Sequence, residues 1–190
     1  MRIDNGRLAE ARQVPSPNHD ARPTGEISAV VLHSISLPPG VFGGDAIERL
    51  FTNRLDPEAH AFFREIAGLR VSAHLLVRRD GTCVQFVPFT ARAWHAGRSR
   101  WVDDGRVRCA LNDFTVGIEL EGDEVTPYRE AQYRTLAAAL RALMATYPAI
   151  TAGRITSHAH IAPLRKTDPG FAFDWAYLRR CLAAGETSVS

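Results

Sequence analysis

The stretch Ile27-Ser28-Ala29-Val30-Val31-Leu32-His33 decides the fold. Its first six residues are almost uninterruptedly apolar and include β-branched residues, which is the pattern of a strand buried on both faces of a sheet. Thr115–Glu121 (TVGIELE) is a second such stretch. A side-chain period of two puts Val116, Ile118 and Leu120 on one face and Gly117, Glu119 and Glu121 on the other. Two buried strands far apart in the chain predict a central sheet.

The segments around these strands alternate between strand and helix patterns. Residues 71–78 and 82–87 flank Asp80-Gly81 and predict a β-hairpin, and residues 150–157 predict a further strand. Apolar residues spaced by three and four predict a long helix that opens at Thr126-Pro127, and Asp174 is expected to cap a last one. Asp45 and Asp56-Pro57 are expected to open two shorter helices. The fold class is therefore α/β (α+β), in a single domain.

Composition limits the domain organisation and the partners. The 190 residues suit one domain, and a net charge of +2 does not suggest nucleic-acid binding. Met1–Thr24 lacks the apolar run of a signal peptide, and no segment has the roughly 20 apolar residues of a membrane span. The three cysteines form no CxxC pair. We expect a cytoplasmic protein with an irregular lead-in at 1–26, a domain at 27–184 and a tail at 185–190.

The stretch Ser157–Gly170 (SHAHIAPLRKTDPG) carries the densest chemistry. Its prolines favour a loop that folds back, which could bring His158 and Asp168 onto one cation. Imidazole and carboxylate suit zinc, which needs one more protein ligand in a hydrolytic site. His33, at the end of its strand, is well placed to be a ligand, although a histidine at the edge of the core that bonds to the backbone is the alternative. Two interpretations stay open here: half of a metal site, or a surface loop with solvated charges.

A second polar stretch, Arg92–Arg108, holds five arginines interleaved with Trp94, His95 and Trp101. Basic and aromatic side chains suit a ligand that carries carboxylates and a sugar face. The alternative is a solvated loop whose tryptophans pack on the core. His74, in the first strand of the expected hairpin, could face the same site as His33.

Five separated segments resemble one family in order, from about residue 5 to 182. They are VLHSISLPPG (31–40), RVSAH (70–74), RAWHAG (92–97), GIELEG (117–122) and RKTDPG (165–170). These motifs closely resemble the AmpD type of N-acetylmuramoyl-L-alanine amidase, which has the peptidoglycan-recognition/type 2 amidase fold. Five motifs in register are far more specific than a single His-x-His or Lys-Asp pair.

The resemblance implies a mixed central β-sheet flanked by helices, and a groove with one zinc ion. It implies His33, His158 and Asp168 as metal ligands, Glu119 as the catalytic acid/base and Lys166 as the cation for the oxyanion. The implied substrate is a cytoplasmic anhydro-muropeptide from cell-wall recycling, cut between the lactyl group and L-alanine. A monomer with no membrane partner is expected, with substrate contacts from Ser34, Arg70, His74, Trp94, His95 and Arg106.

Three residues depart from the family pattern: Ser34 stands in place of a frequent asparagine, Ser157 in place of glycine, and His160 in place of another polar residue. Spacing alone does not decide between His158 and His160 as the ligand, although the alignment favours His158. Two other functions stay open at this stage. One is a peptidoglycan-fragment binding module that does not cut, and the other is a zinc peptidase acting on an unrelated peptide.

Overall fold

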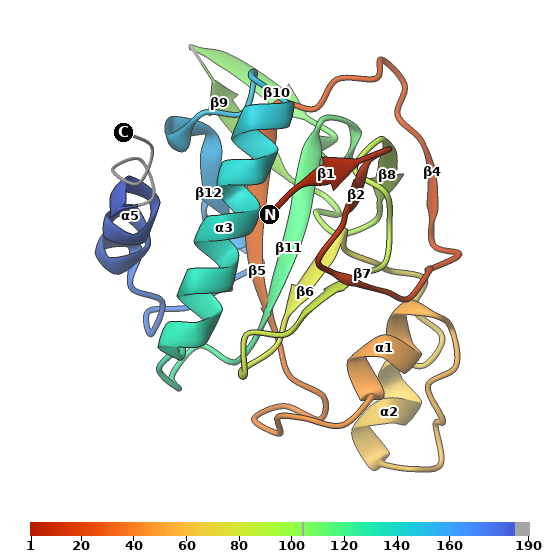
Figure 1. The fold of residues 1–190 in the computed structure, drawn as a ribbon. Coiled ribbons are helices and arrows are strands. Elements are labelled where there is room, and N and C mark those ends of the chain that lie inside the picture. Colours follow the sequence, from red (N-terminus) through yellow and green to blue (C-terminus); the bar gives the residue numbers. More distant parts are fainter. Residues whose placement is uncertain (104, 185–190) are drawn as a thin grey trace.

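The computed structural model describes residues 1–103 and 105–184, and a six-stranded mixed sheet lies at its centre (Figure 1). The strand order is β12-β5-β11-β6-β7-β3. The strands span Ile155–Ser157 (β12), Ala29–Ile35 (β5), Thr115–Glu121 (β11), Leu75–Val77 (β6), Cys83–Gln85 (β7) and Arg12–Gln13 (β3). Only the hairpin pair β6 and β7 is antiparallel within this sheet. The expected mixed central sheet is confirmed.

The two buried strands β5 and β11 pair in parallel, and their alternation separates the two faces of the sheet. One face presents the predicted Val116, Ile118 and Leu120 to a core built with the long helix α3 (Glu130–Thr146) and α5 (Trp175–Ala184). Figure 1 shows α3 lying along this sheet beside β5 and β11. The other face carries His33 and Glu119, which are directly paired in the register of β5 and β11. Polar chemistry is thus confined to one face.

The N-terminal residues differ from the expected irregular lead-in. They form β1 (Ile3–Asp4), β2 (Arg7–Leu8), β3 and β4 (His19–Ala21), and β4 pairs with β8 (Ala91–Ala93). Leu8 has no exposed surface, and β3 extends the central sheet at one edge. This segment therefore packs in one unit with the rest. Strands of two or three residues are too short for a period to show in a sequence. The tail at 185–190 lies outside the described residues.

Helix starts differ at two of the predicted positions. Helix α1 (Ala46–Phe51) follows Asp45 as expected, but α2 (Ala61–Ile66) begins four residues after Pro57. The Asp56 carboxylate accepts a hydrogen bond from the Glu58 amide in a turn, and His60 caps the helix instead. Asp123 accepts from the amides of Val125 and Thr126 in the same way, so that α3 starts only at Glu130. In both segments an aspartate side chain binds backbone amides in a turn, and the helix begins only after that turn.

The arginine-rich stretch is more ordered than the expected loop. Strands β9 (Arg100–Asp103) and β10 (Arg106–Cys109) pair in antiparallel fashion. Short 3₁₀ turns η1 (Leu111–Asp113) and η2 (Ala152–Arg154) precede β11 and β12, and α4 (His158–Ile161) follows β12. Within the residues described, none of the helices has the length and apolar character needed to cross a membrane.

Candidate metal centre and active site

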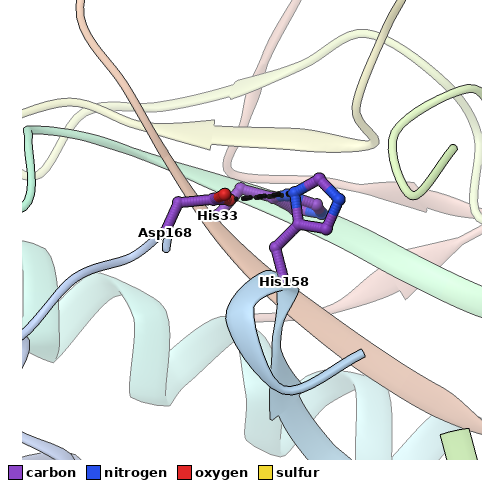
Figure 2. Close-up of side chains that lie close together, drawn as sticks. All are labelled: His33, His158 and Asp168. Atoms are coloured by element: carbon purple, nitrogen blue, oxygen red, sulfur yellow. Dashed lines mark hydrogen bonds and ion pairs between the residues drawn. The ribbon is translucent and has the colours of Figure 1, made fainter. Parts of the chain in front are cut away.

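Three side chains from separate parts of the chain converge at the carboxyl ends of β5 and β12. His33 lies on β5, His158 is the first residue of α4, and Asp168 lies in the loop that follows α4. His33 Nδ1 is 3.0 Å from His158 Nδ1, and both nitrogens are 3.1 Å from Asp168 Oδ2 (Figure 2). Within the described part of the chain, this group is the cluster that could hold a metal ion.

The donor set fits zinc. Ligand atoms about 2.0–2.1 Å from a tetrahedral zinc ion lie roughly 3.3 Å from one another, which is close to the separations found here. The remote ring nitrogens also have partners: His33 Nε2 is 2.9 Å from His95 Nδ1, and His158 Nε2 is 3.3 Å from the Ala96 carbonyl oxygen. Such outer contacts orient a ligating imidazole. Two imidazoles and a carboxylate leave one position of a tetrahedral ion for water or substrate.

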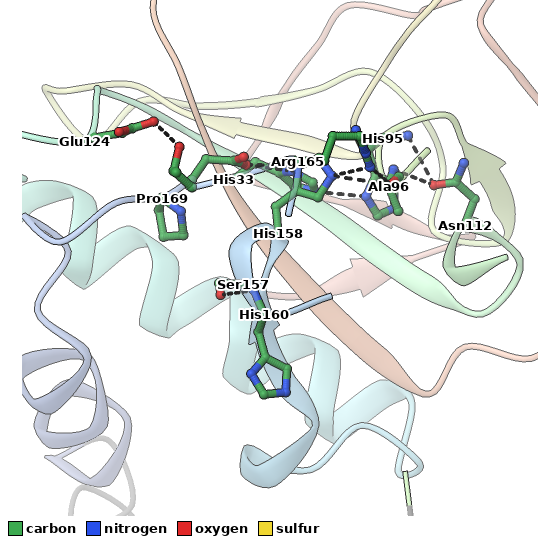
Figure 3. A network of polar contacts seen from close by, with 12 residues as sticks. His33, His95, Ala96, Asn112, Glu124, Ser157, His158, His160, Arg165 and Pro169 are labelled. Carbon is green, nitrogen blue, oxygen red and sulfur yellow. Dashed lines mark hydrogen bonds and ion pairs between the residues drawn. The ribbon is translucent and has the colours of Figure 1, made fainter. Parts of the chain in front are cut away.

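The local structure distinguishes His158 from His160. The Ser157 side chain accepts a hydrogen bond from the His160 amide, which caps α4 at its first turn. His158 then lies at the cluster with only 4% of its surface exposed. His160 is exposed and points away from the cluster (Figure 3). Ser157, which stands where the family often has glycine, thus caps α4.

Burial sets the protonation of the cluster. Loss of hydration lowers the pKa of His33 to about 4, and Asp168, which would accept a hydrogen bond from the protonated ring, acts in the opposite direction. Burial raises the pKa of the Asp168 carboxyl, but the polar contacts with the His158 and His33 rings outweigh it and hold that pKa below its ordinary value. Neutral imidazole and ionised carboxylate are the forms that bind a cation.

Glu119 and Lys166 lie beside this cluster. The Glu119 carboxyl group is buried, and loss of hydration together with the charge of Asp168 raises its pKa well above the ordinary value, while Lys166 acts in the opposite direction. Among the described residues, Glu119 Oε2 is buried and has no hydrogen-bond partner. A buried carboxyl oxygen without a partner indicates a position where a water or a substrate group binds.

A cleft of about 530 Å³ opens next to the cluster. Its walls include Ser34, Lys166 and Asp168, together with the segment 122–125. Glu124 in that segment accepts a hydrogen bond from the Thr167 hydroxyl. The cleft therefore joins the carboxyl end of β5 to the loop that carries Asp168.

The other expected substrate contacts lie in different surroundings. Arg70 and Arg106 are exposed, and Trp94 is half-buried. His74 has no exposed surface: its Nδ1 accepts from the Gly117 amide, and its Nε2 is 3.1 Å from the Ala91 carbonyl oxygen. Both ring nitrogens of His95 also have protein partners, His33 and Thr115. Both ring nitrogens of His74 and of His95 are thus engaged with protein groups.

Two contributors to the site were not identified from the sequence. One is the Ala96 carbonyl, which faces His158 and accepts a hydrogen bond from Arg165 Nη2 at 3.1 Å. The other is Asn112, whose Oδ1 accepts hydrogen bonds from the amides of His95 and Ala96 (Figure 3). A backbone carbonyl gives no signal in a sequence. Asn112 lies in a turn without a periodic pattern, so the sequence gives no signal that it contacts residues 95 and 96.

Three histidines with lowered pKa values predict a steep acid dependence of stability. The pKa of His33 is lowered to about 4 and that of His74 to about 3, and the pKa of His95 is also well below its ordinary value, chiefly by burial. Unfolding releases these rings to protonate below about pH 6.5. The unfolded state then binds more protons, so stability falls as the pH drops from about 6.5 toward 4, by up to about 1.4 kcal/mol per pH unit for each ring.

Urea unfolding of the metal-free protein between pH 7 and pH 4.5 measures this slope. The measurement is best made in the Glu119→Gln variant. The raised pKa of Glu119 makes its contribution to the free energy of unfolding fall as the pH rises, which is opposite to the effect of the histidines. His74→Asn should lose one ring's share of the slope, whereas replacement of the exposed His19 by glutamine should leave it unchanged. A free energy of unfolding that does not vary over this range would contradict the neutral state of the three rings.

Comparisons with known proteins agree with this geometry. A family model described as N-acetylmuramoyl-L-alanine amidase matches residues 23–171. The 1,6-anhydro-N-acetylmuramyl-L-alanine amidase AmpD of Salmonella typhimurium (strain SL1344) is 59% identical over 184 residues, which cover 96% of each chain. A crystal structure of a selenomethionine derivative of AmpD superposes with a TM-score of 0.91 at 55% identity, covering 96% of this chain and 99% of that one.

A ligand complex is also similar in structure. It holds the amidase AmiD from E. coli with the substrate anhydro-N-acetylmuramic acid-L-Ala-D-gamma-Glu-L-Lys. It is 27% identical, with a TM-score of 0.59, and covers 94% of this chain and 62% of that one. The expected resemblance to the AmpD type is confirmed by sequence over 96% of the chain and by the fold, and the chain belongs to the N-acetylmuramoyl-L-alanine amidase family.

Proposed function

We propose that this protein is a zinc-dependent amidase of cytoplasmic peptidoglycan recycling, acting as a monomer. It hydrolyses the amide bond between the lactyl group of 1,6-anhydro-N-acetylmuramic acid and L-alanine in muropeptides. The observation that carries the proposal is the His33–His158–Asp168 cluster with a buried Glu119 beside it, next to a cleft whose wall includes Asp168. The names of the AmpD relatives supply the substrate.

The residues divide the reaction between them. His33, His158 and Asp168 would hold the zinc ion, which when bound supplies Lewis-acid activation of the amide carbonyl and of water. Glu119 accepts a proton from the attacking water, a transfer that its raised pKa favours, and returns it to the nitrogen of the leaving L-alanine. Lys166 donates a hydrogen bond to the oxygen that becomes negative in the tetrahedral intermediate. An amide needs the second proton transfer because an unprotonated amine is a poor leaving group.

Exposed arginines at 70 and 106 offer charge for the carboxylates of a muropeptide stem, and we propose that they bind it. Two other arginines, both in the Arg92–Arg108 stretch, form ion pairs within the protein. Arg92 pairs with Asp20 and Asp113, and Arg108 pairs with Glu26 over the Phe114 ring. Their charges are already compensated, so they contribute less to substrate binding.

Charge reversal tests this role. Arg70→Glu and Arg106→Glu should each raise the Michaelis constant about tenfold, equivalent to about 1.4 kcal/mol, with a smaller change in kcat. Arg134→Glu is the control, because this arginine lies on α3 at the opposite face and forms only an exposed pair with Glu130. Unchanged constants in both variants would show that Arg70 and Arg106 are surface charges only.

Mass analysis of a purified anhydro-muropeptide after incubation with the zinc-loaded protein tests the function itself. Release of free peptide together with free anhydro-sugar supports the amidase. Intact substrate that co-elutes with the protein would support a binding module on the same fold. Products cut within the peptide would support a zinc peptidase.

A further inference from the structure

A series of hydrogen-bonded polar groups, buried at both ends and half-buried at His95, runs from the cluster into the sheet and is not used by the reaction as described. It links His33 on β5, His95 in the segment after β8, and Thr115 at the start of β11. The distances are 2.9 Å from His33 Nε2 to His95 Nδ1 and 3.3 Å from His95 Nε2 to Thr115 Oγ1. Thr115 Oγ1 in turn lies 2.7 Å from the Leu111 carbonyl oxygen.

The Leu111 carbonyl fixes the direction of every hydrogen bond in this chain. A carbonyl oxygen only accepts, so the single hydrogen of the Thr115 hydroxyl points to Leu111. Thr115 Oγ1 can then only accept from His95, which places the hydrogen of the neutral His95 ring on Nε2. His95 Nδ1 is left as an acceptor, and it receives the Nε2 hydrogen of His33.

The consequence for His33 is a defined tautomer. With its hydrogen on Nε2, its Nδ1 carries a free lone pair directed at His158 Nδ1 and Asp168 Oδ2, 3.0 and 3.1 Å away. The other tautomer would place a hydrogen on Nδ1, between the ring and the ion. The tautomer of a ligating histidine is set by the hydrogen bond that its other nitrogen makes.

Gly117 makes room for this arrangement. A Cβ atom added at Gly117 would lie 2.4 Å from His95 Cγ and 2.6 Å from its Cδ2 and Nδ1, far closer than atoms of that kind approach. The glycine in the middle of a buried strand therefore lets the His95 ring lie directly on the sheet, next to His33. His74 supports the ring from another side, with the two ring centroids 5.8 Å apart.

We propose that His95 and Thr115 are positioning residues that act through His33, by holding it in the tautomer whose Nδ1 binds the metal ion. This role replaces the expected contact of His95 with substrate. It rests on the zinc site of the proposed function, but the hydrogen-bond pattern itself is a property of the protein without metal. The two can therefore be tested separately.

Metal affinity gives the first test. Apo-protein is titrated with zinc in competition with a chromophoric chelator. Thr115→Val keeps the shape and removes the hydroxyl, and His95→Phe removes both ring nitrogens. Both should bind zinc about 10–100-fold more weakly, as is usual when the outer partner of a ligating histidine is lost. Thr115→Ser keeps the hydroxyl and should bind as the wild type does.

A matched control separates this effect from loss of a buried hydroxyl in general. Thr135 on α3 donates its hydroxyl hydrogen to the Gly81 carbonyl at 2.8 Å, away from the cluster. Thr135→Val should lose stability to a similar extent and keep the zinc affinity. Wild-type affinity in both Thr115→Val and His95→Phe would overturn the proposal.

The tautomer can also be read in the wild type, so that the test does not depend on the folding of a variant. Long-range ¹H–¹⁵N correlation spectra of the metal-free protein at pH 7.5 distinguish a protonated ring nitrogen from an unprotonated one. We expect the hydrogen of His33 on Nε2 and that of His95 on Nε2. A hydrogen on His33 Nδ1 would overturn the proposal even if zinc binds, whereas wild type that binds no zinc with the expected tautomers would overturn only the metal site.

Discussion

Glu119→Gln is expected to abolish nearly all turnover of anhydro-muropeptide while the protein keeps its zinc. Glutamine has the shape of glutamate but cannot take a proton from water or pass it to the leaving amine. Loss of a general acid/base costs about 10²–10⁴-fold in rate. Kinetics at saturating substrate, combined with the zinc content of the same preparation, measure both quantities. Full activity in this variant would remove Glu119 from the proton transfers.

A stability measurement shows that such a loss is chemical and not a folding defect. Because burial raises the pKa of Glu119, the folded state holds its proton more tightly than the unfolded state does, and the carboxyl group costs stability as the pH rises through that pKa. Metal-free Glu119→Gln should therefore be more stable than wild type at pH 8, and this difference should shrink toward pH 4.

Glu121 on the same strand provides a matched control for Glu119. It is also buried, but its carboxylate accepts hydrogen bonds from the amides of Gly43 and Arg79. Glu121→Gln preserves one acceptor oxygen and removes no group from the cleft, so it should keep most of the turnover. An equal loss in both variants would indicate damage to β11 and not removal of an acid/base.

Replacement of a metal ligand is expected to have an equally large effect, through loss of the ion itself. His33→Ala, His158→Ala and Asp168→Ala should each lose most of the bound zinc after dialysis, and turnover should fall with it. Each variant leaves only two protein ligands, where a hydrolytic zinc site needs three. Elemental analysis against protein concentration gives the zinc content.

His160→Ala is the control for these variants, because His160 lies two residues from His158, is exposed and points away from the cluster. It should keep both zinc and activity. The opposite result, in which His160→Ala loses the ion and His158→Ala retains it, would reverse the choice between the two histidines.

The sequence predicted the elements that have a clear hydrophobic periodicity or a characteristic turn. Thr115–Glu121 matches β11 residue for residue, because seven alternating positions leave little freedom in register. The Asp-Gly turn located the β6 and β7 hairpin, and Asp174 caps α5 by accepting from the Tyr177 amide. The proposed ligand set required the family resemblance, because His33 and Asp168 are 135 residues apart and no spacing rule connects them.

Other features could not be read from the chain. The starts of α2 and α3 depend on aspartates that cap turns before the helix, and a sequence does not show which amide an aspartate takes. The partners of the histidines were equally hidden: a sequence does not show whether a histidine binds a metal or a substrate, and in the structure both ring nitrogens of His74 and of His95 have protein partners. Their environment comes from Gly117 and from segments distant in sequence.

The pairing of His33 with Glu119 has a consequence for changing what this enzyme accepts. The two residues are direct partners on hydrogen-bonded parallel strands, so their spacing is part of the sheet and is not altered by changes in loops. Asp168 and Lys166 instead lie on a connecting segment that also forms the cleft wall. Redesign toward a longer or differently charged stem is best directed at residues 36–40 and 122–125, the cleft segments outside the paired strands, because variation there leaves His33 and Glu119 at a constant separation.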